Sequence, residues 1–465
     1  MLNVFGKGFQ SNLPVAKSVG SLFISNNKPP KEEKAITLDS QQSEIVHSGY
    51  DNILVIAGAG SGKTRVLTER IKYLINSGVP AVNIVAITFT NMAAEEMRDR
   101  LSSIPTIGDA FIGTIHSFAN KILSNSGEEY EIYSEEHDLR FYRYLIRKYC
   151  HHLTLDRYFE YKDLDRQVSS LKVDPDVLSN FFTSGERAEF KLLNRKACEI
   201  EDGDNYPESI DTLCKENNVI TFDDLIVKAN DYFTSIGASV EHLLVDEFQD
   251  IGPLEFKFFV GLHPINTFFC GDDFQSIYGF KGGAVDIFMS LANNPDFHCY
   301  YLTNNYRNGS AIIDFASQII DQVNIKIPKE ITPCRDFEGE YIVDTKLHLG
   351  YYLQQILDKG DFKDWFILTR TNKELFDLMV TCDSFGIPNV TFKREGMSMN
   401  QIQTLLASDK VKILTVHTSK GLESPNVLLF GNFPVQTPSY IRNEEERKVM
   451  YVGITRAENK VIVLN

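Results

Sequence analysis

A glycine-rich loop between a short apolar run and an amphipathic segment constrains this chain more than any other feature. Residues Ile53–Ala57 are uniformly apolar, as expected of a strand that is buried on both faces. Small residues follow, then Lys63 and Thr64, and then helical periodicity over Thr64–Ile75. A strand, a G-x4-G-K-[ST] loop and a helix in this order are typical of a phosphate-binding P-loop. The alternative, a flexible glycine-rich turn, does not account for the strand and the helix on either side.

The chemistry of this loop is that of triphosphate binding. Small residues let the backbone wrap closely around phosphate groups, and its amide hydrogens and the helix N-terminus bind them. Lys63 supplies a positive charge to the β- and γ-phosphates, and the Thr64 hydroxyl is placed to bind Mg²⁺. We therefore predict that ATP and Mg²⁺ bind here. The predicted nucleotide ligands in this part of the chain are Gly58, Ala59, Gly60, Ser61, Gly62, Lys63, Thr64 and Arg65.

A second apolar run ends in acidic residues. Leu243–Val245 is followed directly by Asp246 and Glu247. A P-loop enzyme needs a carboxylate at such a strand end to hold Mg²⁺, and a neighbouring base to orient the attacking water. Asp246 fits the metal role and Glu247 the role of the base. An acidic pair after a strand can also be a solvated turn, but beside a P-loop the catalytic interpretation is favoured.

A third run, Thr267–Cys270, leads into a polar exit that carries chemistry of two kinds. Gln275 is predicted to hydrogen-bond the γ-phosphate. Tyr278 and Phe280 are predicted to stack on bases, so that one short loop would connect the nucleotide to a nucleic-acid strand. The alternative is that these two aromatic residues belong to the core.

Further apolar runs extend the pattern into two sheets. Buried runs that alternate with helices, such as Ala93–Leu101, imply a parallel sheet covered on both faces. Residues 119–215 are rich in Glu, Arg, Tyr and Leu and are periodic in places (Leu139–Tyr149), which predicts a helical insertion. The predicted strands of the first sheet are Ile53–Ala57, Ile84–Phe89, Phe111–Ile115, Leu243–Val245 and Thr267–Cys270; those of the second are Trp365–Thr369, Lys412–Val416, Val427–Phe430 and Val461–Leu464.

Composition limits the class of protein without deciding the partner. A chain of 465 residues is too long for one core, so two or three domains are expected. No apolar run reaches the roughly 18–20 residues that cross a bilayer, and the seven cysteines form no CxxC pair, which favours a reduced, cytoplasmic protein without a membrane partner. The net charge of -16 is compatible with nucleic acid, because positive charge is needed only along the binding groove.

With these motifs in place, the chain resembles the UvrD/Rep/PcrA class of superfamily 1 DNA helicases from about Leu38 to the C-terminus. Residues 38–42 resemble the adenine-reading motif of that family, with Gln42 as its glutamine. Residues 86–97 and 113–118 resemble its two strand-contacting motifs, with Phe89 as a base platform and His116 on the strand. Residues 221–225 are similar to the segment that re-enters the first core domain.

The second half of the chain carries the remaining motifs of this family. The resemblance implies that Tyr306 stacks on adenine and that Arg307 reaches the γ-phosphate. It also implies that Glu423, in the motif over residues 416–423, contacts the ribose. Phe433 resembles a further base-stacking position, and Arg456 resembles a second arginine finger at the end of the last motif, over residues 444–457. Singly, these arginines would be surface residues, whereas in this order they imply a nucleotide held between two domains.

The fold predicted from these features is α/β: two RecA-like P-loop domains with parallel sheets, plus a mostly helical insertion in the first. The predicted segments are a disordered or amphipathic tail over 1–36, the first RecA-like domain over 37–118 and 216–298, the helical insertion over 119–215, and the second RecA-like domain over 299–465.

Departures from the family pattern keep two functions open. Phe280 and Lys281 stand where the family usually has Trp-Arg, which preserves a stacking ring and a DNA-binding cation. Only about a hundred residues separate Arg307 from Val416, so the accessory domain that relatives insert there is predicted to be absent or vestigial. The resemblance implies an ATP-dependent helicase that moves 3′ to 5′ on single-stranded DNA or a tailed duplex. The alternative is a DNA-stimulated ATPase subunit that works with a nuclease or repair protein, as in the Gabija anti-phage system. RNA as the substrate stays open.

Overall fold

The structure is a computed structural model, and it describes residues 37–133, 157–158, 183, 188, 190, 218–278, 285–392, 397, 399–434 and 441–465. The tail predicted over 1–36, the periodic stretch Leu139–Tyr149 and the residues Phe280 and Lys281 lie outside these ranges. The chain divides into two compact units, one of residues 1–118 and 233–465 and the other of residues 119–232. The larger unit contains two six-stranded sheets, which we call the first and the second lobe.

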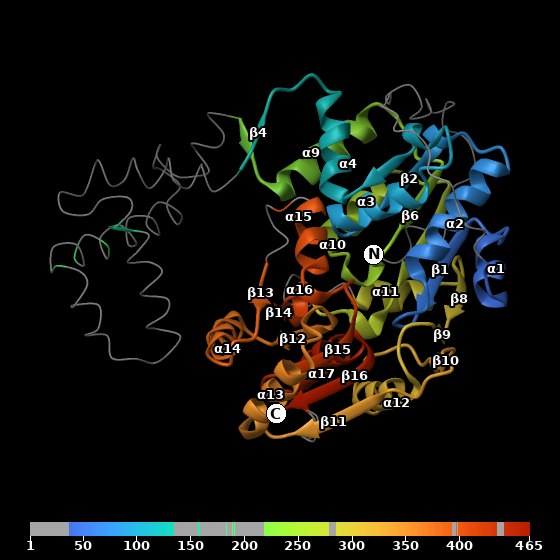
Figure 1. The fold of residues 1–465 in the computed structure, drawn as a ribbon. Coiled ribbons are helices and arrows are strands. Elements are labelled where there is room, and N and C mark those ends of the chain that lie inside the picture. The colour runs from blue at the N-terminus through green and yellow to red at the C-terminus, as the bar shows by residue number, and fades with distance from the viewer. Residues whose placement is uncertain are drawn as a thin grey trace. The chain divides into compact units, whose positions relative to one another are not determined.

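The first lobe is a parallel sheet with the strand order β3-β2-β6-β7-β1-β8 (Figure 1). Its inner strand β1, between β7 and β8, has five consecutive buried residues, since helices cover both faces of a parallel sheet. The strands are β1 (Asn52–Ala57), β2 (Ile84–Ile87), β3 (Phe111–Gly113), β6 (His242–Val245), β7 (Asn266–Gly271) and β8 (His298–Leu302). The helices are α1 (Ser40–Val46), α2 (Lys63–Asn76), α3 (Asn91–Arg100), α4 (Ile115–Ser124), α10 (Pro253–Gly261) and α11 (Val285–Ala292).

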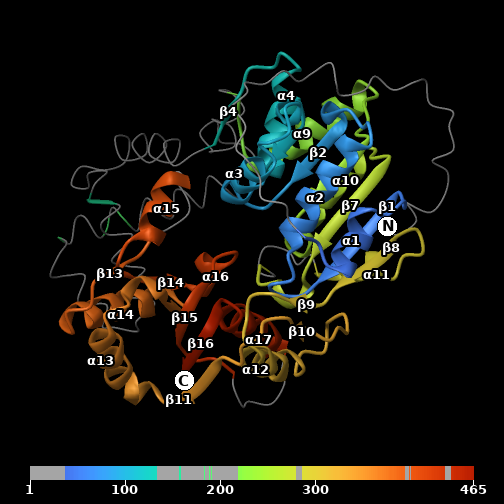
Figure 2. The same ribbon diagram turned by 45° about the vertical axis from the view of Figure 1, so that its right-hand side comes forward.

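The second lobe is another parallel sheet, with the order β11-β16-β15-β12-β14-β13 (Figure 2). A short parallel pair, β9 with β10, lies between the two sheets in the sequence. The strands are β9 (Asn304–Asn305), β10 (Thr332–Pro333), β11 (Glu340–Asp344), β12 (Trp365–Thr369), β13 (Asn389–Val390), β14 (Val411–Thr415), β15 (Ser424–Phe430) and β16 (Ala457–Leu464). The helices are α12 (Ser310–Ile320), α13 (Leu349–Lys359), α14 (Asn372–Ser384), α15 (Met399–Ala407), α16 (Val416–Ser419) and α17 (Ile441–Ile454).

Short 3-10 turns complete the two lobes, and two of them follow strands of the first sheet directly. The turns are η2 (Ala81–Asn83), η3 (Ile107–Asp109), η5 (Phe248–Asp250), η6 (Asp273–Gln275), η8 (Lys346–His348) and η9 (Phe362–Asp364). Because η5 follows β6 and η6 follows β7, both turns lie at the carboxyl edge of the sheet, where ligands of open α/β folds bind.

The predicted fold class is confirmed, and two element boundaries near the site differ from the sequence interpretation. The boundary predicted at residue 298 falls within the first sheet, because β8 continues to Leu302 and pairs with β1. The run predicted as a strand over Phe111–Ile115 ends at Gly113, and α4 begins at Ile115. The Thr114 hydroxyl accepts a hydrogen bond from the Ser117 amide at 3.3 Å, which stabilises the start of that helix.

Of the smaller unit, the structure describes the end of α4, the parallel pair of β4 (Glu131–Ile132) with β5 (Val219–Ile220), and most of α9 (Phe222–Ser235). Most of the helical insertion predicted over 119–215 lies outside the described residues. In the part of the chain that the structure covers, we find no helix with the length and hydropathy that crossing a membrane requires.

Candidate active site

The loop between β1 and α2 is shaped by two glycines. Gly60 and Gly62 have φ values of 64° and 87°, in the left-handed region that favours glycine. A β-carbon on Gly60 would also lie 2.8 Å from Cβ of Arg307, so a larger residue would collide there. Gly62 is the N-cap of α2 and supplies no side-chain hydrogen bond to that helix. The amides of the first turn of α2 are therefore suited to binding an anion.

Two residues of this helix start face the acidic strand end. The Thr64 hydroxyl donates to Oδ2 of Asp246 at 2.9 Å, which places two hard oxygen ligands side by side. Asp246 is 2% exposed and Lys63 is 9% exposed. Glu247 adopts a left-handed backbone with φ of 53°, a conformation that is uncommon for a non-glycine residue and that clusters at functional sites.

The two neighbouring carboxylates differ in their electrostatic surroundings. Burial raises the pKa of Asp246, and the negative charge of Glu247 raises it further. Burial also disfavours the ionised form of Glu247, but the Lys63 and Lys420 cations outweigh it and lower the pKa of Glu247. Glu247 therefore ionises at a lower pH than Asp246, and its carboxylate can accept a hydrogen bond from water.

Gln275 connects the acidic side of the site to an arginine of the second lobe. Its amide nitrogen donates to Oδ2 of Asp272 at 2.7 Å, and its amide oxygen accepts from Nη2 of Arg456 at 3.0 Å. Arg456 is 1% exposed and also donates to the carbonyls of Val452 and Leu422 at 3.0 and 3.2 Å. Burial and the nearby Arg307 cation lower the pKa of Arg456 to about 9.

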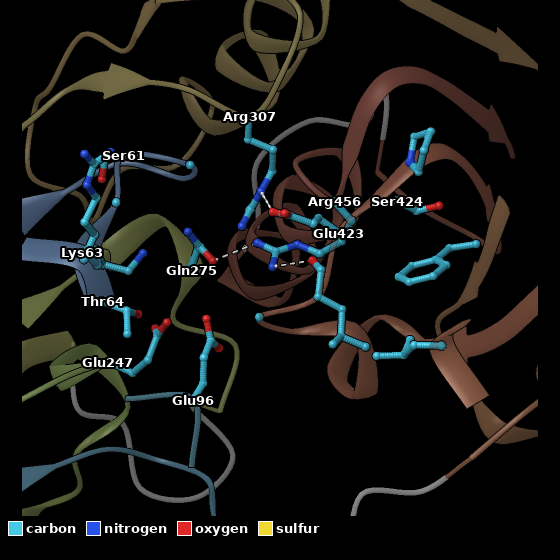
Figure 3. Close-up of a pocket in the computed structure, with 18 of the residues that line it drawn as sticks. Ser61, Lys63, Thr64, Glu96, Glu247, Gln275, Arg307, Glu423, Ser424 and Arg456 are labelled. Atoms are coloured by element: carbon cyan, nitrogen blue, oxygen red, sulfur yellow. Dashed lines mark hydrogen bonds and ion pairs between the residues drawn. The ribbon is translucent and has the colours of Figure 1, made fainter. Parts of the chain in front are cut away.

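Arg307 reaches the same region from the segment between β9 and α12. Its Nε donates to Oε2 of Glu423 at 2.6 Å, and its amide donates to the Asn305 side chain at 2.9 Å. Figure 3 shows Lys63, Thr64 and Glu247 on one side of a pocket, Arg307, Arg456 and Glu423 on the other, and Gln275 between them. The cavity has a volume of about 430 Å³. The predicted site residues that line it are Gly60, Ser61, Gly62, Lys63, Thr64, Arg65, Glu247, Gln275, Arg307, Glu423 and Arg456.

The other predicted nucleotide ligands border this cavity through the loop backbone. Gln42 is 1% exposed and donates to the Ser61 carbonyl at 3.1 Å. The Ala59 carbonyl accepts from the Asn305 side chain at 2.8 Å, and the Gly58 amide donates to the Leu302 carbonyl at 2.8 Å.

Tyr306 lies next to this loop with its ring accessible. Its amide donates to the Gly60 carbonyl at 3.0 Å, and its hydroxyl donates to the Asp39 carboxylate. The side chain is 42% exposed, so the ring is available for stacking.

The predicted nucleic-acid contacts divide into four groups. Phe89 and Tyr278 are partly buried and stack on each other with ring centroids 5.1 Å apart, which brings two segments of the first lobe together. His116 is partly buried near the start of α4. Phe433 differs from its prediction. It is 3% exposed and packs in the core of the second lobe, so its ring is not accessible to a nucleic-acid base in this structure. Phe280 and Lys281 are not described.

Several residues at the site were not singled out in the sequence. The Lys420 ammonium donates to the Asp250 carboxylate and, at 2.9 Å, to the Gln275 carbonyl, and it lies 5.2 Å from the Tyr278 ring centroid. Lys420 lies inside the motif over residues 416–423, so its position was a usable signal. Lys329, which pairs with Asp272 at 2.9 Å, lies outside every motif and gave none.

The P-loop, the acidic strand end and the two arginines of the second lobe around one cavity define a P-loop NTPase with two RecA-like lobes. More specifically, the chain belongs to the UvrD/REP helicase family. The UvrD/REP helicase N-terminal domain matches residues 38–296, and the UvrD-like helicase C-terminal domain matches residues 392–464.

Individual relatives agree with this family. The chain is 28% identical to a probable DNA helicase of Mycoplasma pneumoniae, over 92% of this chain and 83% of the relative. It is 29% identical to the ATP-dependent DNA helicase PcrA of Leuconostoc citreum and 28% identical to DNA helicase II of Escherichia coli, over 63% of this chain in both cases. These matches span only 40% and 42% of the two longer relatives.

Proposed function

We propose that this protein is an ATP-driven motor that moves along single-stranded DNA in the 3′ to 5′ direction and unwinds tailed duplexes. The observation that supports this most directly is that Lys63 of the first lobe and Arg307 and Arg456 of the second line one cavity. A triphosphate bound there would contact both lobes. Its hydrolysis would remove contacts that hold the lobes together, so the lobes could move relative to each other.

The side chains around the cavity suit phosphoryl transfer to water. Lys63 and Arg456 would neutralise charge that develops on the γ-phosphoryl group, and Gln275 would orient it. Glu247 is ionised and would hold the attacking water. Thr64 and Asp246 supply two oxygen ligands for Mg²⁺, which would neutralise phosphate charge when bound. No larger cluster of metal-binding side chains occurs among the residues that the structure describes, and Mg²⁺ in such sites takes its other ligands from phosphates and water.

Contacts behind the cavity would couple hydrolysis to DNA. Tyr278 lies three residues after Gln275, and its ring stacks on Phe89 at 5.1 Å. Lys420 contacts both the Gln275 carbonyl and the Tyr278 ring, so a change at the γ-phosphate would be transmitted to the aromatic pair. Base stacking on such rings tolerates any sequence, so binding would be non-specific and salt-dependent.

The aromatic pair gives the first testable prediction. Tyr278→Ala should weaken binding to an oligo(dT) strand by about 10- to 100-fold, because stacking contributes roughly 1–3 kcal/mol per base. Fluorescence anisotropy with a labelled strand measures this, at a fixed salt concentration. Phe89→Ala should have a similar effect, and the double variant should lose less than the sum because the two rings touch.

Tyr50 offers a matched control for that experiment. It is 55% exposed and stacks on His298 at 3.8 Å in the first lobe, away from the residues assigned to DNA. Tyr50→Ala should bind the strand as the unaltered protein does. Equal affinity of Tyr278→Ala and the unaltered protein would contradict the assignment of the aromatic pair to DNA.

A second function, that of a DNA-stimulated ATPase subunit without unwinding of its own, is favoured by one observation. The described residues between Arg307 and Val416 form α12 to α15 and β10 to β14, which belong to the second lobe and its connection to the first. These described residues therefore include no separate accessory domain, as the sequence predicted. A nuclease or repair protein would then be the partner. Duplexes with a 3′ or a 5′ tail separate the two functions, with strand displacement by the isolated chain as the measurement.

For the helicase, we expect unwinding of the 3′-tailed duplex and no unwinding of the 5′-tailed duplex. ATP hydrolysis without displacement on either substrate would favour the subunit. Preference for the 5′ tail would contradict the proposed direction.

A further inference from the structure

A fully buried lysine connects the two lobes behind the nucleotide cavity. Lys329 belongs to the segment between α12 and β10. The exposed fraction of its side chain is 0%, although its backbone is partly accessible. A lysine is almost never fully buried unless its charge is paired, because removal of the ammonium group from water is costly. The residues that pair with the Lys329 ammonium group therefore indicate what it does in the fold.

Those partners are consecutive residues of the loop that leaves β7 in the first lobe. The Lys329 ammonium donates to Oδ1 of Asp272 at 2.9 Å and to the Asp273 carboxylate, and it lies 3.8 Å from the centroid of the Phe274 ring. Both carboxylates are fully buried. The Ile327 amide, from the same segment as Lys329, also donates to Oδ2 of Asp273 at 2.7 Å. The segment between α12 and β10 thus binds the loop after β7 through the Lys329 ammonium group and the Ile327 amide.

Asp272 links Lys329 to a residue that lines the nucleotide cavity. One of its carboxylate oxygens accepts from Lys329, and the other accepts from the Gln275 side-chain amide at 2.7 Å. The Gln275 amide oxygen is thereby turned toward Arg456, which donates to it at 3.0 Å. A chain of hydrogen bonds therefore runs from the buried lysine to the group that faces the γ-phosphate position. Asp272, Gln275 and Arg456 are each 3% exposed or less, and the Lys329 side chain is 0% exposed.

We propose that Lys329 is a positioning residue for ATP hydrolysis: it fixes the Asp272 carboxylate and, through it, the orientation of Gln275 in the cavity. Lys329 itself lies outside the lining of the cavity. Without the cation, the Asp272 carboxylate would lose its strongest partner, and the Gln275 amide would no longer be held in one orientation. This inference rests on the proposed function of the cavity.

The central experiment is a double-mutant cycle between Lys329 and Gln275. Lys329→Met should lower kcat of DNA-stimulated ATP hydrolysis by about 10- to 100-fold, because a small misplacement of a catalytic group has effects of this size. KM for ATP should stay within about threefold, since the P-loop is unchanged. Gln275→Ala should lower kcat by a similar factor, and the double variant should lose no more than Gln275→Ala alone. Multiplication of the two losses in the double variant would overturn the proposal.

A double variant at Lys329 and Asp273 separates an effect on stability from an effect on catalysis. Lys329→Met leaves two buried carboxylates with less compensation and will lower thermal stability. Asp273→Asn added to Lys329→Met removes one of those charges and should recover much of the stability. The kcat defect should persist, because Asp272 still lacks its partner. Recovery of kcat together with stability would show a merely structural role.

Lys326→Met is the matched single control, three residues earlier in the chain. The Lys326 ammonium contacts the Ile320 carbonyl at 2.9 Å and Asp321 at 3.1 Å, at the end of α12, and it does not contact the loop after β7. This variant should keep kcat near that of the unaltered protein. Absence of DNA-stimulated ATP hydrolysis in the unaltered protein would refute the proposed function, whereas normal kcat in Lys329→Met would refute only the positioning role.

Discussion

Lys63→Ala is expected to lower DNA-stimulated ATP hydrolysis by about 100- to 1,000-fold, which is the usual effect of removing one group that stabilises transition-state charge. Lys63 lies at the start of α2 and lines the cavity beside Thr64. It is the lysine of the P-loop itself, and it is 9% exposed. Steady-state ATPase measurements with saturating oligo(dT) and Mg²⁺ test this expectation.

Folding and DNA binding should survive this change. Lys63 Nζ lies 4.0 Å from Oδ2 of Asp272, and Asp272 keeps its closer bond to Lys329 when Lys63 is removed. The aromatic pair of Phe89 and Tyr278 does not depend on Lys63, so the affinity for single-stranded DNA without nucleotide should be unchanged.

Lys72→Ala, on the same helix, is the control for Lys63→Ala. Lys72 pairs with Glu69 at 3.1 Å within α2 and lies outside the cavity lining, so its loss should leave hydrolysis unchanged. Retention of more than about a tenth of the activity in Lys63→Ala would refute the assigned phosphate site, because a transition-state contact of this kind contributes at least 100-fold.

The fold was predictable where one physical pattern dominated. Strands β1 and β12 lie inside parallel sheets, are buried on both faces and therefore appear as continuous apolar runs. The edge strand β11 was missed, because its residues alternate between exposed and partly buried and form no such run. Strand β8 was missed for the same reason. It is an edge strand of the first sheet, and its histidine and tyrosines are partly buried or exposed.

The site was predictable where chemistry fixes spacing, and not where the fold brings distant residues together. Lys63 and Thr64 are adjacent in a loop of fixed shape, so their roles can be inferred from order alone. The bond of Lys329 to Asp272 joins residues 57 positions apart, and only the tertiary structure shows it. Phe433 illustrates the converse: its position resembled that of a stacking residue, but the side chain packs against the core of the second lobe.

Arg307→Ala is expected to have the largest effect, a loss of about 1,000-fold or more in kcat, which is the usual contribution of an arginine finger. Arg307 is held by Glu423 at 2.6 Å on the second-lobe side of the cavity, while its Cβ lies against Gly60 of the P-loop. Under the proposed function, it would contact the γ-phosphoryl group of a triphosphate that Lys63 binds. ATP binding should weaken far less than hydrolysis, because the first lobe supplies most of the phosphate contacts. Binding of a fluorescent ATP analogue and single-turnover hydrolysis separate the two quantities.

Arg70→Ala tests whether the loss of any well-anchored arginine would give the same result. Arg70 is 7% exposed and donates to the carbonyls of Val46 and Ser48 at 2.8 and 2.7 Å, within the first lobe and outside the cavity lining. Its removal should lower thermal stability and leave kcat near that of the unaltered protein. Normal hydrolysis in Arg307→Ala would mean that the second lobe does not act on the triphosphate. Hydrolysis would then have no direct route to relative movement of the lobes, and the motor interpretation would fail even if the first lobe bound ATP.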